Sequence, residues 1–345
     1  MNIDLLALLA SAAGGFLGAT FGGLIAFVFV GVMLFVGIAI AAAGGDPTFI
    51  NAIAWGPFMG PHIAFLAGLV AAAYAARRGV LPGGGRDIVT PLVSLGRPDV
   101  LLVGALSGVV AYLMQAGLVA IPGLGTKTDT IAATILIVSI IARLAFGKTG
   151  LIGANAEGLT GMKRFKTNAQ NAWLPWQEKP LQVGLMGLFL GGLSAWGTVA
   201  LMTAYPNAAG SVMYLGFALS AFALILLVVG VAVPVTHHIT LQSSLALILV
   251  VSKWPDTSPL VLVLVGVGGE VQWLADHDPR PADPRNAQST DGLGVEHRHR
   301  NDRDVRGQRH PSHAGMALVE PSVRRASALG VDADQAALMQ DVQHR

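Results

Sequence analysis

The feature that most limits the fold of this chain is a set of apolar runs long enough to cross a lipid bilayer. One of them, LIAFVFVGVMLFVGIAIAAA at residues 24–43, has no polar side chain on any face. A helix of about 20 apolar residues spans the roughly 30 Å of hydrocarbon in a bilayer. Strands of a membrane β-barrel would alternate apolar and polar residues instead. These runs therefore predict an all-α, polytopic integral membrane helix bundle.

The composition agrees with a membrane location. Hydrophobic residues make up 53% of the 345 residues and charged residues only 12%, whereas soluble domains carry roughly a quarter charged residues. The 43 glycines suit close helix packing where water provides no driving force. The absence of cysteine excludes disulfides and thiolate metal sites. A net charge of +2 is too small to indicate nucleic-acid binding, so we expect the lipid bilayer as a partner, and no nucleic acid, cofactor or metal.

The apolar runs predict about eight membrane spans. The first run is either one tilted helix or two short helices broken near Gly22 and Gly23, because glycine weakens a helix locally. The predicted spans cover residues 14–43, 60–76, 100–120, 130–146, 181–204, 213–233, 238–252 and 259–275.

The composition changes abruptly after Ala275, where the predicted transmembrane helical domain of residues 1–275 ends. Residues 276–345 hold 10 of the 22 Lys and Arg, all of them arginine, and 6 of the 9 histidines, without Ile, Phe, Tyr or Trp. Such a segment cannot bury enough apolar surface to fold alone. It is either a disordered polar tail or the product of a frame shift that replaced two further spans.

Charges between the spans predict the orientation. The loops 77–99 and 148–180 are basic, whereas the alternate turns, IPGLGTKTD and AYPNAAGS, are nearly uncharged. Cytoplasmic loops carry an excess of Lys and Arg, so we expect both basic loops and the N-terminus on the cytoplasmic side of the plasma (inner) membrane. The basic residues of the two loops are Arg77, Arg78, Arg86, Arg97, Lys148, Lys163, Arg164, Lys166 and Lys179.

Several side chains near the predicted span ends have expected structural roles. Trp173 and Trp176 suit either the headgroup layer or packing within the loop. We interpret Arg143 as an anchor that extends to the cytoplasmic surface, Asp129 as a helix cap, and Glu270 as a candidate buried acid. A helix-packing face is predicted at the small residues Gly184, Gly187, Gly191 and Gly192.

Polar residues interrupt the apolar pattern between the first two spans. The stretch GGDPTFINAIAWGPFMGPHIAF, residues 44–65, combines Asp46, Asn51 and His62 with two Gly-Pro pairs. Gly-Pro breaks a helix, and broken helices at membrane depth need protein or water around their free backbone groups. The stretch is either a discontinuous element that faces the interior or an external loop with a short surface helix.

A second interruption lies in AVPVTHHITLQSSLA, residues 232–246. Imidazole exchanges protons near neutral pH and forms hydrogen bonds through both nitrogens, so His237 and His238 are candidates for a solute or proton pathway. His238 and Gln242 are four residues apart and would share one helix face. The alternative is that the two histidines start a helix at the headgroup layer and are capped by Thr236. The complete candidate pathway contains His62, His238, Gln242, His237, Asn51 and Asp46.

The two interruptions follow the same order of features: an apolar helix, a proline-broken segment, histidine, and a second apolar helix. Five spans separate them, so the two units would run in opposite directions through the membrane. Inverted-repeat transporters have this arrangement, with substrate sites where broken helices meet. One hypothesis is therefore a 5+5 inverted repeat whose last two spans are lost in the altered tail, and the other is a bundle without internal symmetry.

The pattern of breaks predicts a transporter or permease, a secondary carrier or facilitator of a small molecule or ion, and not an enzyme. Homo-oligomerisation is compatible with it. One alternative, a membrane enzyme for a lipid substrate, would need clustered acids, whereas the acids here are dispersed among loops. The other, a membrane subunit of an ATP-driven complex, would bind its ATPase at loop 148–180. The FGKTG motif at 146–150 does not supply an ATP site, since Ala142 occupies the position of the first required glycine.

Overall fold

The computed structural model describes residues 3–125, 128–148, 150–151, 173–177 and 179–275, with the side chains of 269–275 excluded. The predicted polar tail of 276–345 lies outside these residues. So do Lys163, Arg164 and Lys166 of the second basic loop, and the side chain of Glu270.

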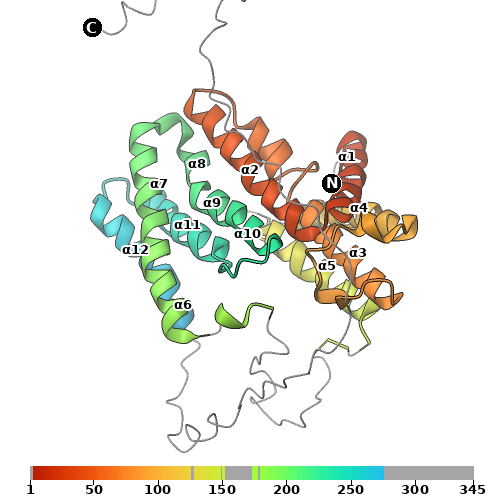
Figure 1. The fold of residues 1–345 in the computed structure, drawn as a ribbon. Helices are drawn as coiled ribbons and strands as arrows, with labels where there is room; N and C mark the ends of the chain where they lie inside the picture. Colours follow the sequence, from red (N-terminus) through yellow and green to blue (C-terminus); the bar gives the residue numbers. More distant parts are fainter. Residues whose placement is uncertain (1–2, 126–127, 149, 152–172, 178, 276–345) are drawn as a thin grey trace, which may run out of the picture. The chain divides into compact units, whose positions relative to one another are not determined.

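All regular elements within the described residues are helices, which confirms the all-α prediction (Figure 1). Short 3₁₀ turns are η2 (Gly84–Arg86), η3 (Leu92–Leu95), η5 (Pro175–Gln177) and η7 (Pro206–Ala208), and π-helices are η1 (Phe49–Ala54) and η6 (Gly187–Gly191). The α-helices are α1 (Leu5–Phe21), α2 (Gly23–Ala42), α3 (Ala64–Arg77), α4 (Pro98–Ala120), α5 (Thr130–Phe146), α6 (Pro180–Met186), α7 (Gly192–Ala204), α8 (Ala209–Val212), α9 (Leu215–Ala223), α10 (Ile225–Val228), α11 (His237–Lys253) and α12 (Pro259–Ala275).

Four helices of the described residues are long and apolar enough to cross a membrane, which suggests an integral membrane protein. They are α2, α4, the continuous helix Pro180–Ala204, and the segment Pro206–Val228. Shorter apolar helices are α1, α3, α5 and Pro259–Gly268.

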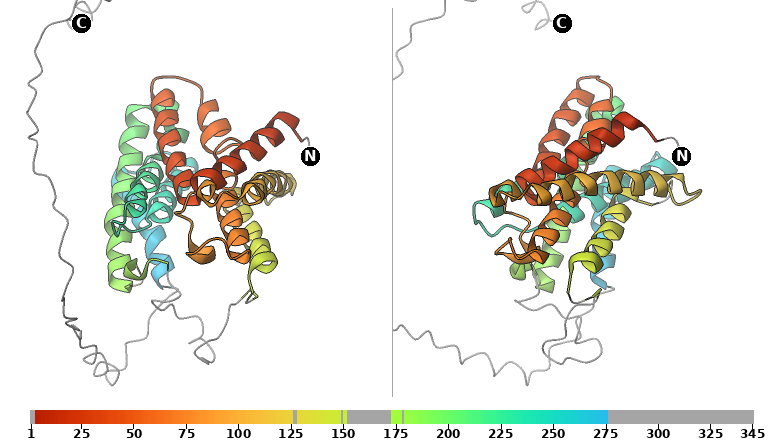
Figure 2. Two further views of the ribbon diagram at one scale, coloured as in Figure 1. Left: turned by 45° about the vertical axis from the view of Figure 1, so that its right-hand side comes forward. Right: turned by 90° about the vertical axis from the view of Figure 1, so that its right-hand side faces the viewer.

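The first apolar run folds as two helices, which agrees with one of the two alternatives. The helices meet at Gly22 with a sharp change of direction (Figure 2). Gly22 has a positive φ of 88°, a conformation that glycine adopts without steric cost. The Leu24 N–H donates to the carbonyl of Ile88 at 2.9 Å, so a loop residue satisfies the backbone at the break.

The predicted start of the first span at residue 14 is wrong, because α1 begins at Leu5. The Asp4 carboxylate accepts a hydrogen bond from the Leu6 N–H at 2.8 Å and caps the helix. The predicted end of the 213–233 span is wrong as well. The helix ends at Val228, because Gly230 takes a positive φ of 83° and residues 229–236 leave the helical conformation.

Close helix contacts depend on glycine, as expected for a membrane bundle. Helix α1 packs on α4 so closely that a Cβ atom on Gly15 would lie 2.4 Å from the Gly104 carbonyl oxygen. In the predicted glycine face, Gly187 and Gly191 are buried, and η6 packs against α12.

Helix α2 lies between two sets of helices and contacts both. On one side it packs against α3, which also contacts α1, α4 and α5. On the other side it packs against α9, which contacts α7 and α11 (Figures 1 and 2). The largest buried apolar cluster follows α2 and includes Leu24, Phe27, Val30 and Leu34. Packing of α2 therefore brings the two interrupted parts of the chain together.

Candidate functional site

Five ring side chains pack together where α2, α9, the end of η1 and the start of α11 meet. The ring of Phe217 lies 5.1 Å from Trp55, 5.6 Å from Phe27 and 5.5 Å from His237, measured between ring centroids. Phe27 also lies 4.6 Å from His237, and Trp55 lies 5.2 Å from Tyr214. We call these five residues the aromatic–imidazole cluster.

Both interruptions of the apolar sequence contribute a ring to this cluster. Trp55 belongs to residues 43–63 between α2 and α3, the first broken segment. It follows the last residue of η1, and its backbone N–H donates to the Ile50 carbonyl. His237 follows directly after residues 229–236, the second broken segment, and is the first residue of α11. Trp55 of the first broken segment and His237, which directly follows the second, therefore both pack on the ring of Phe217, although 182 positions separate them in the chain.

Two cluster residues carry a buried polar atom without a hydrogen-bond partner in the described structure: Trp55 through Nε1 and His237 through Nδ1. The same holds for His62 Nδ1 and Ser243 Oγ elsewhere. Buried polar groups are normally hydrogen-bonded. The indole N–H is a donor only, whereas an imidazole Nδ1 donates or accepts according to its tautomer. The cluster thus offers a donor and a second polar atom among apolar ring faces.

His62 is buried, with 2% of its surface exposed, but it lies apart from the cluster. No hydrogen bond or ring contact joins it to His237 within the described residues. Its ring lies against the backbone of Gly60, where an added Cβ atom would be 2.7 Å from Cε1. The first broken segment is buried from Met59 to Ile63, whereas Asp46 and Asn51 are exposed.

Of the other predicted pathway residues, His238 lies beside the cluster, with its ring centroid 4.1 Å from that of His237, whereas Gln242 lies outside it. His238 and Gln242 do share a face of α11, but that face is exposed. The inward face carries Thr240, Ser243 and Ser244, which are buried. The His237 ring packs against Phe27, whereas His238 is exposed on the other side of the His237 ring.

The alternative interpretation of the histidines as a Thr236-capped helix start is partly wrong. His237 does begin α11, but Thr236 makes no side-chain cap. Its hydroxyl donates to Ser220 at 3.0 Å instead. The start of α11 is therefore attached to α9.

A family model described as a family of unknown function (DUF7973) matches residues 1–275. The chain belongs to this family. No curated protein matches the chain, and no solved structure does. The matched range contains every helix described above, and with them both broken segments and the aromatic–imidazole cluster.

A chain of buried hydroxyls connects α7, α9 and α11 of this DUF7973 protein. The sequence analysis did not predict these contacts. Ser194 Oγ donates to the Thr240 carbonyl at 2.8 Å and lies 3.0 Å from Ser244 Oγ, which lies 2.9 Å from Thr198 Oγ1. Ser220 Oγ lies 3.2 Å from Thr240 Oγ1. The available signal was the spacing of four residues in both Ser194/Thr198 and Thr240/Ser244, which places each pair on one helix face.

The second broken segment of the DUF7973 chain is held by the loop that precedes α6. The Trp176 indole N–H donates to the Val233 carbonyl at 3.2 Å. The Gln177 side chain bonds both backbone groups of Val235. This bond agrees with the loop-packing alternative for Trp176. Backbone groups of Val233 and Val235 in the break are thus satisfied by protein.

The remaining predicted residues lie at helix ends. Asp129 caps α5 by accepting from the Ala132 N–H at 2.9 Å, which confirms the predicted cap. Arg143 is exposed, and its Nε donates to the carbonyls of Gly150 and Leu151 beyond the helix end. Across the described parts of the DUF7973 chain, no three His, Asp or Glu side chains come close enough to hold a metal ion.

Proposed function

We propose that this DUF7973 protein is a multi-pass membrane transporter or permease that moves a small solute past the aromatic–imidazole cluster. The observation that carries the proposal is the packing on Phe217 of Trp55, from the first broken segment, and of His237, directly after the second. Substrate sites of many secondary transporters lie where discontinuous helices meet near the midplane of the bilayer. A chain that only anchors itself in lipid has no need for two such interruptions at one place.

The cluster supplies suitable chemistry for a small polar solute. Trp55 Nε1 and His237 Nδ1 are its buried polar atoms without a partner in the described structure. The ring of Phe27 packs against His237, and the ring of Phe217 packs against Trp55. A solute group that accepts from the indole and bonds the imidazole would replace hydrogen bonds lost from water. Movement of α11 or of the second broken segment would then expose the solute to one side of the membrane.

The proposed topology keeps about eight spans, counting α1 and α2 as one broken unit. The N-terminus and the loops 77–99 and 148–180 lie in the cytoplasm of a plasma-membrane protein. Their excess of Lys and Arg supports this orientation. An inverted repeat would relate α2, the first broken segment and α3 to α9, the second broken segment and α11.

Transport is tested by reconstituting the protein in vesicles and measuring uptake of radiolabelled amino acids, sugars, nucleosides and carboxylates. For any solute that is taken up, Trp55→Phe and His237→Gln should each reduce uptake about tenfold, because each removes one buried hydrogen bond to the solute. Ser252→Ala is the matched control, because Ser252 is an exposed residue of α11 whose hydroxyl donates to the Leu249 carbonyl of the same helix. Folding is checked by gel filtration and circular dichroism.

Two outcomes would contradict the proposal. Unchanged uptake in both cluster variants would remove the site, and no flux of any solute in the panel would remove the transport function. His62→Gln adds a further arm. Reduced uptake in this variant would place the first histidine on the same route, and normal uptake would assign it a packing role.

A further inference from the structure

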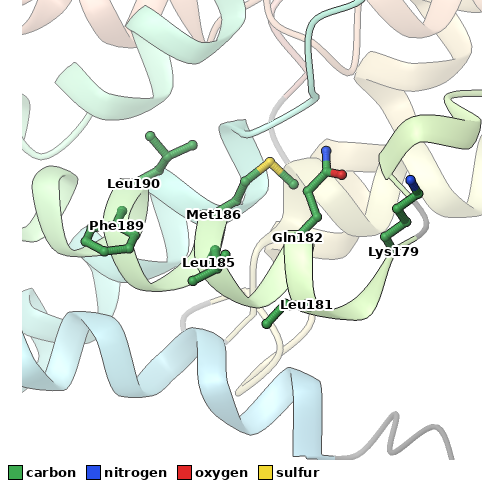
Figure 3. Close-up of a pocket in the computed structure, with 7 residues that line it drawn as sticks. All are labelled: Lys179, Leu181, Gln182, Leu185, Met186, Phe189 and Leu190. Carbon is green, nitrogen blue, oxygen red and sulfur yellow. The ribbon is translucent and has the colours of Figure 1, made fainter.

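An open groove runs along α6 and η6, away from the aromatic–imidazole cluster. Its volume is about 490 Å³. Figure 3 shows Lys179 and Gln182 toward one end of the groove, and Phe189 and Leu190 toward the other. The residues that line it are Lys179, Leu181, Gln182, Leu185, Met186, Phe189 and Leu190.

The lining of the groove is almost wholly apolar, and Lys179 lies at one end of it. Leu181 is 77% exposed and Phe189 is 67% exposed, so the apolar side chains lack a covering element in the described structure. Lys179 is exposed as well. An occupant that matches this order has a negatively charged head and a long apolar tail.

The length of the groove agrees with one leaflet of a bilayer. Lys179 and Leu190 are eleven positions apart, which corresponds to about 16 Å of helix at 1.5 Å per residue. The hydrocarbon core is roughly 30 Å thick, so one leaflet contributes about 15 Å. We propose that this groove binds an anionic phospholipid, with its phosphate at Lys179 and one acyl chain along Leu181 to Leu190.

The neighbouring structure fixes the charged end of the groove. Trp176 and Gln177, just before Lys179, are hydrogen-bonded to the second broken segment. These hydrogen bonds therefore hold the turn that precedes Lys179, the N-cap residue of α6. A basic residue at the membrane surface attracts anionic lipid. The proposal requires a membrane protein but not a transporter, so it stands apart from the proposed function.

Lipid selectivity provides the test. Purified protein is supplied with phosphatidylglycerol or phosphatidylcholine, and lipid retention is measured by native mass spectrometry, together with the thermal midpoint. We expect phosphatidylglycerol to be retained preferentially and to raise the midpoint more. Lys179→Gln should lower the preference about fivefold. Lys179→Arg should preserve it, which separates loss of charge from misfolding.

Matched variants complete the experiment. Lys253→Gln removes an exposed charge at the end of α11 and should leave the preference unchanged. Glu178→Gln should increase it by removing a neighbouring negative charge. An unchanged preference in Lys179→Gln overturns the proposal. Equal stabilisation by glycerol phosphate, which has no acyl chain, would indicate a free-anion site instead. A Phe189→Ser variant that changes the oligomeric state but not lipid retention would indicate a second copy of the chain.

Discussion

The side-chain amide of Gln177 pairs with both backbone groups of Val235, as a neighbouring strand would. Gln177 Nε2 donates to the Val235 carbonyl at 2.7 Å, and the Val235 N–H donates to Gln177 Oε1 at 2.8 Å. Val235 lies two residues before His237, which enters the aromatic–imidazole cluster. The pairing therefore ties the loop before α6 to the position of the imidazole.

Replacing Gln177 by alanine should destabilise the protein by about 2 kcal/mol, because it leaves two partly buried backbone groups without partners. Gln177→Glu should lose less stability than Gln177→Ala, since a carboxylate still accepts from the Val235 N–H, although it cannot donate to the Val235 carbonyl. The free energy of unfolding is measured in mixed micelles, with the exposed Gln242→Ala as control. Equal stability of Gln177→Ala and the wild type would show that the pairing is dispensable.

Sequence patterns located the helices well where polar residues or proline bound an apolar run. Helices α5 and α12 coincide with the predicted spans 130–146 and 259–275, and α5 begins after its cap at Asp129. The end of α10 was not predictable in the same way. The letters after Val228 remain apolar, and only the positive φ of Gly230 shows that the helix has ended.

The segments that meet at the aromatic–imidazole cluster are local features of the sequence, whereas the contacts between them are not. The two interruptions are visible in sequence as prolines and histidines. The choice between His237 and His238 depends on how α11 is rotated about its axis, and that rotation is set by contacts such as Ser220 with Thr236. Contacts between residues far apart in sequence, such as Trp55 with Phe217, have no local signal.

Close packing of α1 on α4 gives a second prediction. A Cβ atom on Gly108 would lie 2.1 Å from the Ser11 carbonyl oxygen, whereas Gly117 on the same helix has open space around it. Gly108→Ala should cost about 1–3 kcal/mol, because the helices must separate. Gly117→Ala should be neutral or more stable by up to about 1 kcal/mol, from helix propensity.

The measurement for this pair is the free energy of unfolding under one set of conditions. The two variants make the same chemical change on the same helix, so propensity cancels in the comparison. If Gly108→Ala were as stable as Gly117→Ala, the contact between α1 and α4 would be looser than described.

The hydroxyl network gives a third prediction, which concerns α7 and α11. Ser194 and Ser244 are buried, and their hydroxyl oxygens lie 3.0 Å apart. A double-mutant cycle with Ser194→Ala and Ser244→Ala should give a coupling energy of about 0.6 kcal/mol, the usual size for hydrogen bonds between membrane helices. Ser194→Ala combined with Ser252→Ala should be additive, because Ser252 bonds only within its own helix. Zero coupling in the first cycle would contradict the observed bond.

The fourth prediction concerns pH and the exposed turn after α2. The hydroxyl and the backbone N–H of Thr48 both donate to Asp46, and they hold the pKa of this carboxyl below its ordinary value of 3.8. A lowered pKa in the folded state stabilises the turn above pH 3.8, and this contribution is lost as the pH falls through the folded pKa. Thr48→Ala should move the pKa of Asp46 toward 3.8 but leave it lower, because the backbone donor remains, whereas Thr48→Ser should keep the wild-type value. Carbon-detected NMR titration of the Asp46 carboxyl measures all three proteins. A wild-type pKa at or above 3.8 would show that the Thr48 bonds do not persist in solution.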